Sequence, residues 1–90
     1  LSSQLIEGQA ELMEIIATPH MNILDTPISE LDLHDGIIIA AIHRGSEVII
    51  PNGDTEIHED DRIILLSLLR DRVITESLLK DTGKQGFFRR

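Results

Sequence analysis

The chain has 90 residues, of which sixteen are acidic and eight basic, so its formal net charge at pH 7 is −8. This excess of acid disfavours binding to nucleic acid or to an anionic lipid surface, because both require basic patches. The absence of cysteine excludes disulfides, thiolate metal sites and cysteine nucleophiles. No apolar run approaches the roughly 20 residues of a membrane-spanning helix. We expect one small intracellular domain and, because the sequence begins without Met, one excised from a longer polypeptide.

The N-terminal residues predict a linker followed by a strand. Residues 1–9 are assigned to a linker from a preceding domain, with residues 1–8 as the end of a helix that Gly8 closes. The apolar side chains of residues 9–17 fit either a short strand or one and a half helical turns. We favour a strand, because the segment ends in Ile-Ile-Ala-Thr-Pro and the later strands need a further partner.

Residues 25–36 predict a short helix. Thr26 suits the N-cap, and Pro27 suits the first helical position, where its missing N–H costs nothing. Ile28 and Leu31 would share one face of this helix. Gly36 would then end it in the left-handed conformation.

Three aliphatic runs follow, and turn residues separate them. The runs are residues 37–42, 48–50 and 63–69, and the turns are Arg44-Gly45-Ser46 and Pro51-Asn52-Gly53-Asp54. Runs rich in Ile and Val between glycine-containing turns predict an antiparallel meander.

Both faces of these strands are apolar. Simple alternation places Ile37, Ile39, Ala41 and His43 on one face and Ile38, Ala40, Ile42 and Arg44 on the other. An antiparallel sheet with one solvated face should instead alternate apolar with polar residues. Since 90 residues with one good helix can hardly cover both faces, we expect a second copy to cover part of the sheet.

The last predicted element is a helix over residues 70–81. Its apolar side would carry Val73, Ile74, Leu78 and Leu79, Glu76 and Lys80 would form an i,i+4 pair, and Gly83 would end it. We expect an α+β domain over residues 10–82, followed by a tail at 83–90. Its small, mostly antiparallel sheet would follow the order strand, helix, three strands, helix, with the short helix before the core hairpin.

No residues form a recognisable catalytic or metal-binding pattern. The four histidines lack helical i,i+4 pairing, and the nearest approach to a metal site, His58-Glu59-Asp60-Asp61, is better explained as a solvated acidic turn. The chain has no glycine-rich phosphate cradle and no nucleophile elbow. We therefore expect neither an enzyme nor a metal site.

Polar residues gather where the predicted elements end. His34 and Asp35 end the short helix, and His43 and Arg44 end the first core strand. At a two-fold interface each would occur twice and could form a pocket for a small anionic ligand. The alternative is that Arg44 is a hairpin residue paired with a nearby acid such as Glu47.

Three stretches resemble the RCK C-terminal domain, also called the TrkA-C domain: I-S-E-L-D-L, then H-D-G-I-I-I-A-A-I-H-R-G-S-E-V-I-I-P-N-G-D-T-E-I, then E-D-D-R-I-I-L-L. The resemblance covers residues 10–79. The chain departs from the family at Asp60, where the family usually has Gly. The closing helix and the Phe87-Phe88 tail look like the C-terminal end of TrkA-like potassium-uptake regulatory proteins.

The resemblance implies a regulatory domain that dimerises and couples a small ligand to a potassium transporter or channel. In some relatives cyclic di-AMP binds between two copies, at positions that correspond to Ile28, Asp32, Leu33, His34 and Ile38. Those relatives have Arg in place of His34 and Asn in place of Ile38. NAD or ATP binding belongs to a nucleotide-binding N-terminal domain that this sequence does not contain.

The expected protein is a cytoplasmic homodimer at the inner face of the cell membrane, attached through a potassium transporter or channel subunit. Its expected ligand site combines the five positions above with His43 and Arg44. Two alternatives stay open: a purely structural assembly domain without ligand, and the built-in TrkA-C domain of another membrane carrier. A metal-dependent hydrolase would need at least three convergent ligands.

Overall fold

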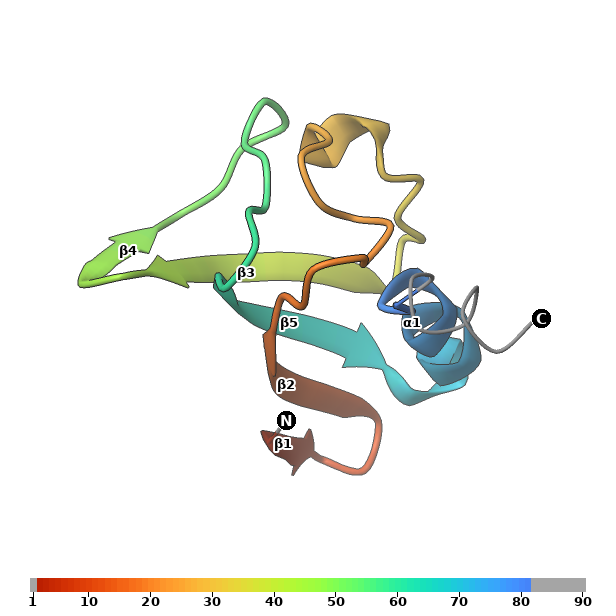
Figure 1. Cartoon of the computed structure of the whole chain (residues 1–90). Coiled ribbons are helices and arrows are strands. Elements are labelled where there is room, and N and C mark those ends of the chain that lie inside the picture. The colour runs from red at the N-terminus through yellow and green to blue at the C-terminus, as the bar shows by residue number, and fades with distance from the viewer. Residues whose placement is uncertain (1, 82–90) are drawn as a thin grey trace, which may run out of the picture.

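The structure, a computed structural model, describes residues 2–81 and within them contains one antiparallel sheet and one α-helix (Figure 1). The strands are β1 (Ser2–Ile6), β2 (Ala10–Ile16), β3 (Ile37–Arg44), β4 (Glu47–Ile49) and β5 (Arg62–Leu68), and the helix is α1 (Arg72–Leu78). Two 3₁₀ turns cover Ile28–Glu30 and Leu69–Asp71. The spatial order of the strands is β1-β2-β5-β3-β4. The α+β class, the strand at residues 9–17 and the final helix are thereby confirmed.

The connection between β4 and β5 departs from the predicted meander. β3 and β4 form the expected hairpin, with Gly45 at a φ of +61° in its turn. β5, however, pairs with β3 and β2 and not with β4. The intervening residues cross the sheet and bury Ile57 completely. A direct hairpin would leave that side chain in a solvated turn, so burial of Ile57 favours the crossing.

A β-bulge at Ala40 changes which side chains of β3 share a face. The pairing with β5 shifts register between Ile39 and Ala41. Because the bulge inserts one unpaired residue, Ile42 falls on the same face as Ile37 and Ile39. Simple alternation placed Ile42 on the opposite face, and that prediction is wrong.

One face of the sheet carries the core. Its fully buried side chains include Ile42, Ile63 and Leu65, which pack with residues from outside the sheet such as Ala17, Ile23 and Ile57. Figure 1 shows the two long connections, residues 17–36 and 50–61, rising together on one side of the sheet. Leu78 and Leu79, at the end of α1, pack against the same core. These segments form the second layer of the domain.

The N-terminal residues are a strand and not the predicted helix end. β1 pairs along its whole length with β2, from Ser2 opposite Glu14 to Ile6 opposite Ala10. Glu7 and Gly8 make the turn, both with positive φ values. Gly8 therefore allows a hairpin, where the sequence analysis assigned it to a helix terminus.

The predicted helix at residues 25–36 is reduced to the 3₁₀ turn Ile28–Glu30. Its first backbone N–H groups bond to the crossing connection, Ile28 N to Thr55 O at 2.9 Å and Ser29 N to Gly53 O at 2.9 Å. Thr26 makes no N-cap bond and donates its hydroxyl to Leu24 O instead. Gly36 is not left-handed. A Cβ there would meet the Asp71 side chain, so close packing accounts for the glycine.

The C-terminal helix is shorter than predicted and rotated about its axis. Val73 is 78% exposed and Ile74 38% exposed, whereas Thr75 is fully buried. Glu76 pairs with Arg72 at 3.3 Å and not with Lys80. Gly83, the predicted helix end, and the tail at residues 83–90 lie outside the described residues.

Two buried hydroxyl groups attach α1 to the sheet. Thr75 Oγ1 lies 2.8 Å from Ser67 Oγ on β5, and it donates to Asp71 O at 3.0 Å. A threonine can face the core here because its hydroxyl has two hydrogen-bond partners, Ser67 Oγ and Asp71 O.

Replacing Thr75 with Val should lower the free energy of unfolding by about 1–3 kcal/mol, because it leaves the Ser67 hydroxyl with one partner fewer in a buried site. Chemical denaturation measures the change. A control substitution, Ser77→Ala on the exposed side of the same helix, should change it by less than about 0.5 kcal/mol. An unchanged stability in Thr75→Val would contradict this account of how α1 is attached.

Candidate ligand site and the open face of the sheet

The second face of the sheet, called the open face below, is uncovered and largely aliphatic, and its polar residues are Ser2, Gln4, Glu14, His43 and Arg62. By strand register it carries the aliphatic side chains of Ile6, Ala10, Leu12, Ile16, Ile38, Ala41, Val48, Ile64, Leu66 and Leu68. None of these side chains is buried by the residues that the structure describes. Val48, Ile38 and Ile16 are 63%, 53% and 49% exposed. Exposed apolar surface of this kind is typical of an interaction site.

The seven residues predicted to bind ligand do not converge within one chain. Ile28 and Leu33 pack against the core on the covered side. Asp32 and His34 are exposed in the segment between the 3₁₀ turn and β3.

The remaining three belong to β3 and lie on its two faces. Ile38 and His43 share the open face with Leu66 and Arg62, their partners on β5. Arg44 projects to the covered side. Whether the seven residues bind ligand stays a prediction.

A hollow marks the open face beside Ile38. It has a volume of about 210 Å³ and is lined by Asp35, Gly36, Ile38, Leu66 and Leu68. Its walls are largely aliphatic, and Asp35 supplies a carboxylate at its rim. Further along β3, His43 lies between Val48 and Arg62 and gives this end of the open face nitrogen donors.

Arg44 forms a bidentate ion pair with a buried acid. Its Nε donates to Asp61 Oδ1 at 2.9 Å and its Nη2 to Asp61 Oδ2 at 2.7 Å. The Asp61 side chain is 2% exposed and also accepts the backbone N–H of His58 at 2.8 Å. The hydrogen bonds from Arg44 hold the pKa of Asp61 below its ordinary value, with help from the His58 N–H and against the opposing effect of burial. The acid that pairs with Arg44 is therefore Asp61, where the sequence analysis suggested Glu47.

Comparison with known proteins identifies the family. The model of the TrkA-C domain matches residues 12–71. The chain belongs to the TrkA-C domain family. This confirms the resemblance that the core stretch of the sequence carries.

Relatives and a solved structure agree with this assignment. Trk system potassium uptake protein TrkA of Haemophilus influenzae is 42% identical over 64 residues. TrkA of Azorhizobium caulinodans is 32% identical over 76 residues, which is 84% of this chain and 17% of that protein. A structure described as an RCK domain with cda superimposes with a TM-score of 0.63 at 25% identity, covering 77% of this chain and 97% of that one.

This TrkA-C domain spans a small part of its curated relatives. The match covers 68% of this chain and 14% of the Haemophilus influenzae protein. Among residues 2–81, no helix is long and apolar enough to cross a membrane.

Sequence reasoning missed the structural role of the acidic turn before β5. The turn was expected to be solvated, yet Asp61 is almost fully buried. Asp60, at the position where TrkA-C domains usually have Gly, has a φ of +72°. This left-handed conformation explains the glycine preference, and Asp tolerates it better than most other residues. No local pattern in the sequence distinguishes Asp61 from its acidic neighbours, because its partner Arg44 is seventeen positions away.

Proposed function

We propose that this TrkA-C domain is a regulatory module of a potassium-uptake system. Two copies would dimerise through the open face, and a small ligand bound between them would alter the gating of a transporter or channel subunit. Its relatives are named Trk system potassium uptake proteins, and their similarity to this chain lies in this domain. The module would act in the cytoplasm at the inner face of the cell membrane.

The open face is the observation that carries the proposal. An antiparallel sheet that faces water normally presents polar side chains there. Here the central strands present Ile38, Ile64 and Leu66 instead. Each Å² of apolar surface removed from water contributes about 25 cal/mol, and a domain of this size buries only roughly 60–65% of its unfolded surface by itself, less than a larger domain does. A second copy offers an identical apolar surface, as a two-fold contact requires.

A two-fold contact through the open face would bring together Ile38 and His43 of both copies. The predicted ligand residues of the covered side would stay outside this contact: Ile28, Leu33 and Arg44. Each copy would supply Ile38 and the hollow beside it, together with His43 as a donor to an anion. Arg62, beside His43, already forms an ion pair with Glu14 at 3.3 Å. The related RCK domain is described with cda, and cyclic di-AMP is the ligand that we propose to test first. Such a ligand shifts the gating equilibrium only by as much as it favours one dimer arrangement over another.

A ligand screen by thermal unfolding tests this function. A ligand present at a hundred times its dissociation constant should stabilise the folded state by about 2.7 kcal/mol, which corresponds to roughly 10 °C or more in Tm for a domain of this length. We expect such a shift with cyclic di-AMP and none with NAD or ATP. The shift should disappear in Ile38→Asp.

A second function is favoured because the predicted ligand residues do not converge: those on β3 lie on both of its faces, and Ile28 and Leu33 pack against the core. On this alternative the domain only assembles the protein and binds no ligand. Uniformly absent shifts with cyclic dinucleotides, nucleotides and small anions, in a chain that still dimerises, would establish it and overturn ligand sensing.

A further inference from the structure

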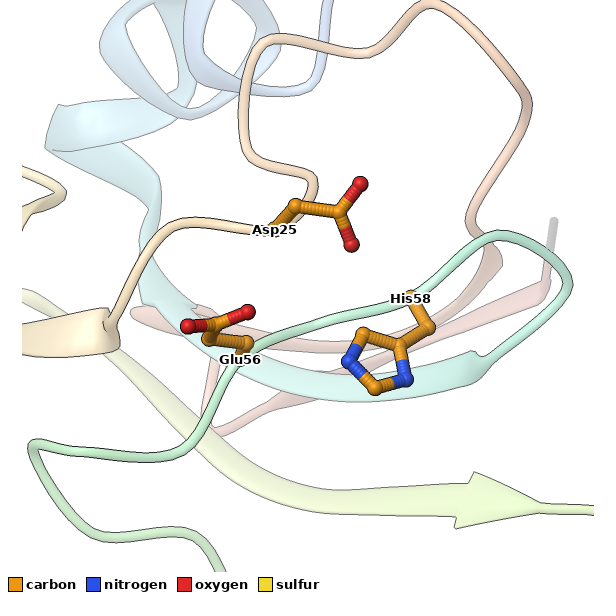
Figure 2. A group of neighbouring side chains, drawn as sticks. All are labelled: Asp25, Glu56 and His58. Carbon is orange, nitrogen blue, oxygen red and sulfur yellow. The ribbon is translucent and has the colours of Figure 1, made fainter.

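Three side chains that can bind a metal meet on the covered side of the domain. Figure 2 shows Asp25, Glu56 and His58 arranged around a common space. One carboxylate or imidazole atom from each lies within 4.8 Å of the corresponding atoms of the other two. They come from the two long connections, more than 30 positions apart in the sequence.

The backbone explains why these residues meet. Asp25 N donates to Ile57 O at 2.8 Å, and Leu24 and Ile57 form a parallel bridge. Asp25 is thereby fixed beside Ile57, between the positions of Glu56 and His58. Ile57 itself points into the core and is fully buried. Since alternate residues of an extended segment point the same way, Glu56 and His58 both project away from the core toward Asp25.

The ion pair of Arg44 and Asp61 holds the backbone of Glu56 and His58 in place. Arg44 Nη2 donates to Glu56 O at 3.0 Å, and His58 N donates to Asp61 Oδ2 at 2.8 Å. The backbone of both residues is thus hydrogen-bonded to an ion pair whose acid, Asp61, is almost fully buried. A ligand set attached to a fixed backbone needs little ordering when a metal binds.

The charge of the group favours a cation. Within residues 2–81 the carboxylates of Asp25 and Glu56 make no ion pair, and neither accepts a hydrogen bond. The two carboxylates bring negative charge into a small space beside the imidazole of His58. Two oxygen donors and one nitrogen donor suit first-row transition metals, whereas Ca²⁺ and Mg²⁺ prefer oxygen alone.

We propose that Asp25, Glu56 and His58 form a binding site for a divalent transition-metal ion such as Zn²⁺, with water completing the coordination. Metal bonds of 2.0–2.2 Å place tetrahedral ligand atoms roughly 3.4 Å apart. Asp25 and His58 are exposed, so rotation of their side chains can close the remaining gap. The sequence alone predicted no metal site, and its nearest approach to one was residues 58–61. The pairing of His58 with Asp25 depends on the tertiary fold.

Isothermal titration of the untagged chain with ZnCl₂ tests the site. We expect one saturable site per chain and much weaker binding of MgCl₂. Asp25→Asn and His58→Ala should each weaken Zn²⁺ binding by more than tenfold, since even changes behind the first ligands cost roughly 10–100-fold. Asn tolerates the positive φ of 57° at position 25, so Asp25→Asn should fold.

Matched control variants distinguish Zn²⁺ binding at this site from non-specific Zn²⁺ binding elsewhere on the chain. Glu59→Gln removes an acid three positions from Glu56, and His20→Ala removes an exposed histidine outside the group. Both should retain the affinity of the parent chain within about twofold, and circular dichroism confirms the fold of every variant. Absent saturation with Zn²⁺, or equal binding by Asp25→Asn, His58→Ala and the controls, would overturn the proposal. The proposed metal site lies within one chain, so the result of the Zn²⁺ titration does not depend on dimerisation.

Discussion

Replacing Ile38 with Asp should convert the proposed dimer to a monomer. Ile38 is 53% exposed in the single chain, so the carboxylate stays hydrated when the domain folds alone. A two-fold contact would bury two such carboxylates. A penalty of about 1.4 kcal/mol for each would raise the dimer dissociation constant roughly a hundredfold.

The matched control is Val73→Asp, which makes the same kind of change at an exposed position of α1, away from the open face. Val73 is 78% exposed. Sedimentation equilibrium of both variants should show a loss of dimer in Ile38→Asp alone. Equal dimerisation by the two variants would exclude the centre of the open face as the interface.

Replacing Asp61 with Asn should cause the largest loss of stability. The substitution removes the charge that pairs with Arg44 and weakens three hydrogen bonds in a buried position. Because the Arg44 side chain is 34% exposed, water offsets part of the loss, and we expect a decrease of about 2–4 kcal/mol in the free energy of unfolding. Denaturation at equal protein concentration measures it, since dimerisation also contributes to stability.

The same ion pair predicts how stability depends on pH. The pKa of Asp61 is lower in the folded chain than in the unfolded one. Its stabilising contribution is therefore complete above the unfolded value of about 3.9 and is lost as the pH falls through the lower folded value. The parent chain should lose this contribution below about pH 4, and Asp61→Asn should not.

Glu59→Gln is the control for both measurements with Asp61→Asn. Glu59 is an exposed acid two positions away in the same turn, and its replacement should change stability by less than about 0.5 kcal/mol. If the two variants lose equal stability, or keep the same acid dependence as the parent, the buried ion pair is not what fixes this turn.

The aliphatic runs predicted the strands well, because period-two patterning and glycine turns are local signals. They also predicted that both faces of the sheet would be apolar, which the open face confirms. Local signals could not place β5 beside β3, since that pairing depends on burial of Ile57 by the crossing connection. They also missed the bulge at Ala40, which moves Ile42 to the core face.

The helices and the polar contacts were less predictable for a related reason. Thr26 and Pro27 form a good helix start, but the backbone that follows bonds to residues 53–55. Thr75 was overlooked because its burial depends on Ser67, eight positions earlier. Arg44 pairs with Asp61, seventeen residues away in the sequence. Asp25 and His58 lie close together although they belong to different long connections. Such partners are set by tertiary structure and leave no spacing to detect.

The central claim is that two copies of this domain meet through the open face. Sedimentation equilibrium of the unmodified chain at micromolar concentration tests it most directly. The account predicts a species with twice the 10.1 kDa mass of one chain. A single species of 10.1 kDa across that range would contradict it.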